Sequence, residues 1–186
     1  MRLLLPPSET KLSGGTGPAL AIANLGFPEL NPIRTLVAAQ LVALANDVAE
    51  CRRLLGLSPT QDGEIARNAG LLDSATLPAI ERYTGVLYRE LDWPTLPPGA
   101  KRRARSSLLV FSGLWGAVSP QDPIPYYKLK MSASLDGLGR LATWWRPRLD
   151  EALGPVLRGR TVWDLLPQEH AAAWTPAASS CRLTVA

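Results

Sequence analysis

The sequence predicts a single domain of the α+β class over residues 1–186, in which a mixed β core is wrapped by helices. Its length suffices for one domain with a sizeable core. Hydrophobic residues make up 46% of the chain and charged residues 19%, which is typical of a globular protein. Short apolar runs of strand length occur among longer stretches of helical period, and 17 prolines divide the chain into short elements.

Four segments have the pattern of short strands. Residues 2–5 consist of an arginine and three leucines and end at a pair of prolines. Residues 108–111 form a second apolar run that leads into a Ser-Gly pair. Residues 162–166 and 182–186 have the same character. These four segments are expected to form the β core.

Helical periodicity marks the stretches between these strands. In the first stretch, apolar residues recur at three and four positions, preceded by Asn31 as N-cap and Pro32 as the first helical residue. A break in this helix is expected near Asn46. Gly85 weakens the third stretch by ~1 kcal/mol relative to alanine. The predicted helices cover approximately residues 32–55, 60–69, 77–91 and 144–153.

The sequence Leu55-Gly56-Leu57-Ser58 joins the first two predicted helices in a tight turn and makes an αα-hairpin. Its apolar-glycine-apolar pattern is similar to the turn of helix-hairpin-helix DNA-binding motifs. In those motifs, backbone N–H groups at the turn and at the second helix meet a phosphate. Ser58 stands where the usual turn has a second glycine, and such hairpins also serve as packing units. Gly56 and Ser58 are therefore candidate phosphate contacts on pattern alone.

Several functional classes find no support in the sequence. The first apolar run is too short for a signal peptide, and no run reaches the ~18 residues of a membrane span. Cys51 and Cys181 lie far apart and His170 is the single histidine, so metal-ligand spacing is absent. No Walker loop or dinucleotide fingerprint occurs, and we predict no cofactor. Two free thiols in a reducing cytoplasm are the simplest interpretation, with a disulfide as the alternative.

Positive charge is concentrated in the second half of the chain. Residues 1–100 carry 8 Lys or Arg against 10 Asp or Glu, whereas residues 101–186 carry 12 against 6. This asymmetry indicates an anionic partner, nucleic acid first, although a solvated surface gives the same pattern. Basic residues beside aromatic pairs suit phosphate contact next to base packing, or else core tryptophans with snorkelling arginines. The basic positions are Lys101, Arg102, Arg103, Lys128, Lys130, Arg146 and Arg148.

The loop after the first predicted strand reads Ser8-Glu9-Thr10-Lys11. Its Ser-x-x-Lys spacing matches the serine–lysine motif of penicillin-binding enzymes, but the companion Ser-Asp-Asn and Lys-Thr-Gly motifs are absent. The neighbouring prolines and glycines favour a loop over the helix that this chemistry needs. Because strand ends commonly carry ligand loops, we expect Ser8 and Thr10 to donate hydrogen bonds to a phosphate. Lys11 would supply the opposite charge.

Three motifs carry a resemblance to a known family. They are LLPPSETK at residues 4–11, ERYTGVLY at residues 81–88, and SGLWG, PQD and YKLKM within residues 112–131. In this order and spacing they resemble the YaaA peroxide-stress family of bacterial cytoplasmic proteins. The resemblance implies one mixed α and β domain, with a helix-hairpin-helix element and a positively charged cleft that binds double-stranded or distorted DNA. It also implies a role in limiting free iron and oxidative DNA damage during peroxide stress.

The chain departs from the family pattern at several positions. Glu9 stands where some members have lysine, Ser119 where they have arginine, and Lys130 where they have an acidic residue. The stretch 167–170 also differs from the family's Ser-x-Glu-Tyr-like sequence. Family members continue well beyond residue 186. The resemblance therefore implies that this chain lacks a C-terminal portion, which would line the cleft.

Three functional predictions remain open. The leading one is a DNA-binding stress protein with backbone contacts and with no catalytic residue or metal ligand. The alternative is an enzyme for a phosphorylated or nucleic-acid substrate in the same cleft. Its residues would be Ser8, Lys11, Asp122, Tyr127 and Lys128, although Asp122 also fits a turn cap. The third is a packing fragment without activity. The candidate phosphate-binding residues are Ser8, Thr10, Lys11, Gly56, Ser58, Lys101, Arg102, Arg103, Ser112, Gly113, Tyr127, Lys128, Lys130, Arg146 and Arg148.

Overall fold

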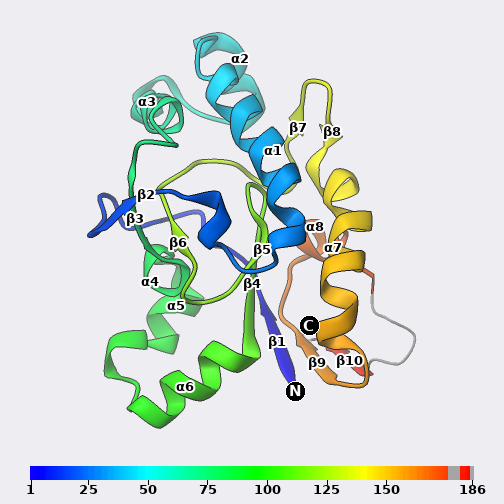
Figure 1. Ribbon diagram of the computed structural model, residues 1–186. Helices are drawn as coiled ribbons and strands as arrows, with labels where there is room; N and C mark the ends of the chain where they lie inside the picture. Colours follow the sequence, from blue (N-terminus) through cyan, green and yellow to red (C-terminus); the bar gives the residue numbers. More distant parts are fainter. Residues whose placement is uncertain (176–180, 185–186) are drawn as a thin grey trace.

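A five-stranded sheet lies at the centre of the computed structural model, which describes residues 1–175 and 181–184 (Figure 1). Its strands are β1 (Arg2–Leu5), β4 (Leu108–Ser112), β5 (Gly116–Val118), β9 (Thr161–Asp164) and β10 (Cys181–Thr184). The strand order is β10-β9-β1-β4-β5. Every pair is parallel except β4 and β5, which are antiparallel. The single α+β domain predicted from the sequence is confirmed.

The predicted strands agree closely with this sheet. The segments at residues 2–5, 108–111 and 162–166 are β1, β4 and β9. The segment predicted at 182–186 corresponds to β10, and residues 185–186 lie outside the described part of the chain. All five positions of β4 are buried, as expected for a strand covered on both faces. The N-terminal strand β1 pairs with β4 and β9, so it lies in the interior of the sheet.

Helices and two small sheets surround the five strands. Figure 1 shows α7 on the right of the view, α2 and α3 at the top, and α6 at the lower left. No helix in residues 1–175 or 181–184 is long and apolar enough to span a bilayer. The remaining strands are β2 (Gly17–Ala19), β3 (Ala75–Pro78) and β6 (Pro123–Ile124) in one sheet, and β7 (Ser134–Leu135) and β8 (Gly139–Arg140) in the other. The helices are α1 (Asn31–Leu44), α2 (Val48–Leu55), α3 (Gly63–Ala69), α4 (Ala79–Arg82), α5 (Val86–Leu91), α6 (Pro98–Ser107), α7 (Leu141–Leu157) and α8 (Gln168–Ala171), with 3-10 helices η1 (Ile22–Asn24), η2 (Pro28–Leu30), η3 (Pro59–Gln61) and η4 (Trp93–Thr95).

The predicted helix at residues 77–91 is wrong as one continuous element. The structure divides it into the end of β3, then α4, then α5. Tyr83 is extended and its backbone bridges to Lys11, while the Thr84 N–H donates to the Thr10 carbonyl at 3.1 Å. The helix is therefore interrupted because Tyr83 and Thr84 pair with the backbone of the loop after β1 instead of continuing the helical hydrogen bonds.

Other helix boundaries follow the sequence with local differences. The break expected near Asn46 is confirmed, since α1 ends at Leu44 and α2 begins at Val48. Asn31 is the first residue of α1 rather than its N-cap, which is Leu30. The basic run at 101–105 lies within α6, and α7 continues through Pro147.

The predicted turn at Gly56 connects α2 to α3 by way of η3, and the helix-hairpin-helix element expected there is not confirmed. Gly56 ends α2 in the left-handed conformation at φ 65°, which glycine adopts without strain. The Ser58 N–H donates to the Gln61 side chain at 3.0 Å, and this pair caps η3. That N–H is thus already satisfied within the turn. The DNA-binding role of this hairpin stays a prediction.

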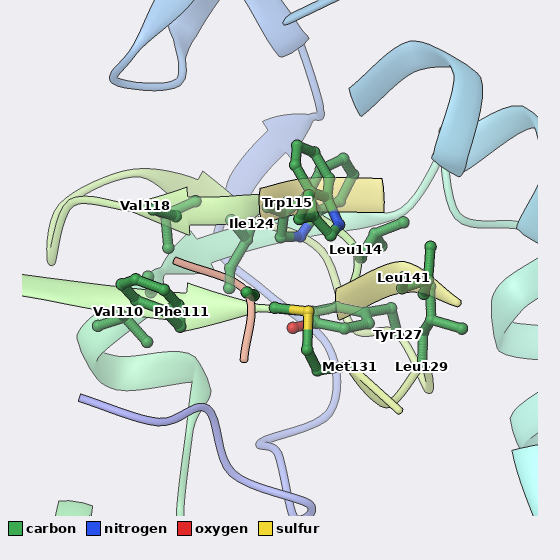
Figure 2. Close-up of a cluster of buried hydrophobic side chains, with 14 of the residues drawn as sticks. Val110, Phe111, Leu114, Trp115, Val118, Ile124, Tyr127, Leu129, Met131 and Leu141 are labelled. Carbon is green, nitrogen blue, oxygen red and sulfur yellow. The ribbon is translucent and has the colours of Figure 1, made fainter. Parts of the chain in front are cut away.

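A tightly packed cluster lies beyond the end of β4 (Figure 2). The Trp115 and Tyr127 rings meet edge to face, with centroids 6.1 Å apart. Gly113 lies so close to the segment 130–131 that a Cβ there would stand 2.8–2.9 Å from its backbone atoms. The Trp145 indole N–H donates to the Gly113 carbonyl at 2.9 Å. Glycine at 113 therefore lets the segment that carries Lys128 and Lys130 pack directly against the end of β4.

Two arginines are fully buried among backbone carbonyls. Arg34, on α1, donates to the carbonyl oxygens of Trp115 (3.0 Å) and Ala117 (2.6 Å) and so fastens the helix to β5. Arg82 donates to the carbonyl oxygens of Leu12, Gly14, Ala75 and Ile124. These four acceptors belong to three separate parts of the chain. One side chain thus orders the loop after β1 against β3 and β6.

We expect Arg82→Met to lower the free energy of unfolding by about 3 kcal/mol or more. The reason is that buried carbonyl oxygens would lose their donors. Urea denaturation followed by circular dichroism measures this change. The matched control is Arg53→Met, because the Arg53–Glu50 pair lies on the surface. A similar loss of stability in both variants would contradict the role given to Arg82.

Candidate functional site

A cavity of about 230 Å³ lies at the carboxyl ends of two adjacent parallel strands, β1 and β9. The loops that follow these strands form much of its wall, and the segment 128–130 closes it. Crevices at this edge of a parallel sheet are common places for ligands. Its lining residues are Pro6, Pro7, Ser8, Glu9, Lys11, Lys128, Leu129, Lys130, Pro167, Glu169 and His170.

Lys11 is a basic group of this cavity whose pKa lies well below its ordinary value. Its Nζ donates to the Ser8 carbonyl at 2.9 Å and lies 4.5 Å from the centroid of the Tyr127 ring. Desolvation lowers the pKa of Lys11 from 10.5 to about 8. The charges of Glu9 and Glu64 oppose this change, while those of Lys128 and Arg82 add to it. At pH 7 roughly a tenth of the Lys11 side chains are therefore neutral amines.

Tyr127, whose ring lies next to the Lys11 ammonium, is buried in the core. Its hydroxyl lies 2.7 Å from the Ser112 hydroxyl and 2.8 Å from the Tyr83 hydroxyl. Burial raises the pKa of Tyr127 to about 12, although the hydrogen bonds to Ser112 and Tyr83 lower it. Ser112 also accepts hydrogen bonds from the backbone N–H groups of Leu114 and Trp115. Ser112 and Tyr127, both predicted phosphate contacts, are thus buried in an internal network behind the cavity wall.

The segment that carries Lys128 is fixed by Asn68. This fully buried amide accepts from the Lys128 N–H (2.9 Å) and donates to the Lys128 carbonyl (2.9 Å). The Lys128 ammonium lies 2.6 Å from a Glu9 carboxylate oxygen. Burial raises the pKa of Glu9, but the hydrogen bond and charge of Lys128 outweigh it and leave this pKa lowered. Lys130 is exposed and lines the same cavity, together with Leu129 between the two lysines.

His170 contributes a buried imidazole from α8. His170 is only 5% exposed. Neither nitrogen of its ring has a hydrogen-bond partner within the described residues. Its Nδ1 lies 3.5 Å from a Glu169 carboxylate oxygen. Desolvation lowers the pKa of His170, against the opposite effect of Glu169 and Glu9. The imidazole is therefore held mainly neutral at the cavity wall.

The structure brings four predicted site residues together, Ser8, Lys11, Lys128 and Lys130. Thr10 is exposed and does not line the cavity, but its hydroxyl lies 3.2 Å from that of Ser8. Gly113 acts through close backbone packing rather than through an exposed group. The other predicted positions lie elsewhere on the fold: Gly56, Ser58, Lys101, Arg102, Arg103, Arg146 and Arg148.

Basic residues outside the cavity pack on neighbouring aromatic rings. The Arg148 guanidinium lies 4.0 Å from the centroid of the Trp144 ring, and the Arg146 side chain donates to Thr175 at 3.0 Å. Lys101 donates to the Pro94 carbonyl at 2.9 Å. In these places the aromatic and basic pattern reflects contacts within the protein, as the snorkelling interpretation predicts.

Asp122, the proposed general base of the enzyme alternative, caps a turn. Its carboxylate accepts from the backbone N–H groups of Ser119 (2.9 Å) and Gly26 (3.0 Å). Burial raises its pKa, while these hydrogen bonds and Arg34 lower it. Asp122 does not line the cavity, so the turn-cap interpretation describes its contacts.

Sequence reasoning missed Asn68, Glu169 and His170 as site residues. A single histidine without metal-ligand spacing gives no site signal in the sequence, and neither does a lone asparagine in a helix. Among the described residues, no group of three or more His, Cys, Asp or Glu side chains is placed to hold a metal ion. The polar side chains that line the cavity offer amines, carboxylates, one hydroxyl and one imidazole.

The pKa of Lys11 predicts a specific pH dependence of stability. Because the folded-state pKa of about 8 lies below the ordinary 10.5, the unfolded chain binds more protons between these values. The stability of the wild-type protein relative to a Lys11→Met variant should therefore rise as pH increases from about 8 to about 10.5. Urea denaturation of both proteins across this range tests it. A difference that stays constant with pH would show that Lys11 titrates normally.

Comparison with known proteins assigns the chain to a family. A UPF0246 protein of Streptomyces coelicolor is 47% identical over 177 residues, covering 95% of this chain and 68% of the relative. UPF0246 proteins of Corynebacterium glutamicum and Corynebacterium efficiens are 40% and 41% identical, covering 82% and 86% of this chain. The chain spans 62% of the length of each of these two relatives. The family model described as peroxide stress protein YaaA matches residues 1–185, and the chain therefore belongs to this family.

Proposed function

We propose that this protein acts in the peroxide stress response by binding DNA through backbone phosphates at the cavity beside β1. The observation that carries the proposal is the convergence of Lys11, Lys128 and Lys130 on one cavity. Cationic side chains supply most of the affinity for a phosphate backbone and need no base-specific contact. The membership of the peroxide stress family gives the biological setting.

The three lysines differ in their availability. Lys130 is exposed and needs no rearrangement to meet a phosphate. Lys128 is paired with Glu9, whose side chain is 59% exposed and can turn toward solvent when a phosphate arrives. Lys11 is withdrawn from water, so an approaching phosphate would favour its protonated form. Phosphate binding and protonation of Lys11 are thus expected to be coupled.

Protection of DNA from iron-driven oxidation is the second part of the proposal. Its support is the family assignment together with the cavity lysines. A protein bound along the backbone excludes other cations from the phosphates that it contacts, because binding releases condensed counterions. We propose that displacement of iron ions from DNA is one route to the lower oxidative damage.

The alternative function is an enzyme for a phosphorylated or nucleic-acid substrate in the same cavity. Two observations favour it: the lowered pKa of Lys11, and the His170 imidazole, whose nitrogens have no hydrogen-bond partner among the described residues. Perturbed titratable groups in a cleft are typical of catalytic sites. Of the residues predicted for the enzyme, Ser8, Lys11 and Lys128 line the cavity.

The salt dependence of binding to duplex DNA tests the leading proposal. Between about 50 and 200 mM salt, we expect affinity to fall steeply, with no preference for sequence. Lys130→Ala should reduce the slope of log K against log salt by about 1, because one phosphate contact is lost. Fluorescence anisotropy with a labelled duplex measures the slope.

The control for this test is Lys101→Ala on α6, a matched Lys-to-Ala change outside the cavity. The proposal expects its slope to equal that of the wild type. If Lys101→Ala lowered the slope and Lys130→Ala did not, the DNA surface would be α6 and the cavity proposal would fail.

A further inference from the structure

The cavity contains an amine with a lowered pKa and a buried imidazole without a hydrogen-bond partner among the described residues. Lys11 and His170 both line it, one on the loop after β1 and the other on α8. The imidazole of His170 is buried, and its nitrogens have no hydrogen-bond partner among the described residues. Buried polar groups are nearly always paired, so such an exception requires an explanation. A ligand that exchanges protons with the imidazole would provide one.

We propose that the Lys11 amine forms an imine with the aldehyde of a phosphorylated sugar bound in this cavity. The inference rests on the proposed function for the source of that sugar, since an abasic deoxyribose in DNA carries an aldehyde at C1′ next to backbone phosphates. Free sugar phosphates share the same chemistry. The site would thus recognise an aldehyde and a phosphate together.

The surroundings of Lys11 suit a nucleophilic amine. Its Nζ donates one hydrogen to the Ser8 carbonyl at 2.9 Å, which leaves the lone pair of a neutral amine free for a carbonyl carbon. With a pKa of about 8, roughly a tenth of the molecules carry this neutral amine at pH 7. Desolvated lysines of this kind form Schiff bases in many enzymes.

The remaining cavity suits a sugar phosphate. Its volume of about 230 Å³ compares with ~30 Å³ for one water molecule in the liquid, so a small sugar fits. Lys128 and Lys130, on the segment 128–130 that closes the cavity, provide positive charge for the phosphate. In this arrangement the phosphate lies on Lys128 and Lys130 rather than on Lys11. Desolvation and, to a lesser degree, the charge of Lys128 keep the pKa of the Lys11 amine low, so the amine is available for bond formation.

The proposed reaction balances without an oxidant or reductant. The Lys11 lone pair forms the N–C bond while the C=O π pair moves to oxygen. One N–H proton then passes through the His170 imidazole to that oxygen and gives the carbinolamine. A second proton, taken from solvent through the same imidazole, lets the hydroxyl leave as water. The nitrogen lone pair then forms the C=N bond of the protonated imine.

Reductive trapping tests the inference. The protein is incubated with sodium cyanoborohydride and either a duplex with one abasic site or free deoxyribose 5-phosphate. Reduction of the imine to a secondary amine fixes the adduct, and peptide mass spectrometry locates it. We expect one adduct per chain on Lys11, with at least a tenfold loss in Lys11→Ala and no loss in the matched control Lys101→Ala.

The two sources of the aldehyde give different results. Trapping of the abasic duplex supports the DNA sugar, whereas trapping of deoxyribose 5-phosphate alone supports the imine and overturns the DNA source. Adducts that persist in Lys11→Ala would overturn the inference, because they would reflect unselective lysine reactivity. Binding of intact duplex with a steep salt slope, but without a Lys11 adduct from either probe, would overturn the imine and leave the proposed function standing.

The role of His170 has its own test. In His170→Asn, we expect the trapping rate to fall at least tenfold, because general acid–base catalysis contributes ~10²–10⁴-fold. Affinity for the intact duplex should stay unchanged, which separates proton transfer from folding. The pH profile of trapping should also change shape. An unaltered rate and profile in a folded variant would remove His170 from the proposal.

Discussion

The buried guanidinium of Arg82 is the interaction on which the geometry of the site depends. It donates to carbonyl oxygens of the loop after β1, of β3 and of β6 at once. With these contacts in place, Lys11 pairs with the backbone of Tyr83 and its ammonium lies beside Tyr127. Since the guanidinium remains charged and has donors on three nitrogens, it can satisfy several carbonyls that no apolar side chain could. The position of Lys11 is therefore fixed by buried hydrogen bonds in the core rather than by the surface loop alone.

The opposite wall of the cavity is fixed by two local constraints. Gly113 allows the backbone of residues 130–131 to approach the end of β4, where any side chain would collide. Asn68 pairs with both backbone groups of Lys128 in the way that a neighbouring strand would. Together they align a short extended segment whose lysines reach the cavity. A rigid segment holds its charges at fixed positions, which favours selective binding of a compact anion.

The lysines of the cavity lie in different environments. Lys130 is suited to electrostatic binding of an anion, whereas Lys11 is suited to proton exchange and reaction of its amine. Lys130 remains in water and acts as a plain positive charge. Lys11 lies against Tyr127 and loses hydration, so its amine is poised to titrate near physiological pH. Basic residues outside the cavity, such as Arg148 on Trp144, are engaged with their own fold.

The sequence by itself determined strands β1, β4 and β9, the break between α1 and α2, and a polar loop at the end of the first strand. It also determined the family, because three motifs occur in order. Only the tertiary structure decided that residues 77–91 divide into separate elements, that Ser112 faces the core, and that His170 reaches the cavity. The physical reason is that periodicity and turn residues report local burial. The meeting of residues far apart in the chain, such as Lys11 and His170 at one cavity, depends on how the sheet orders its strands.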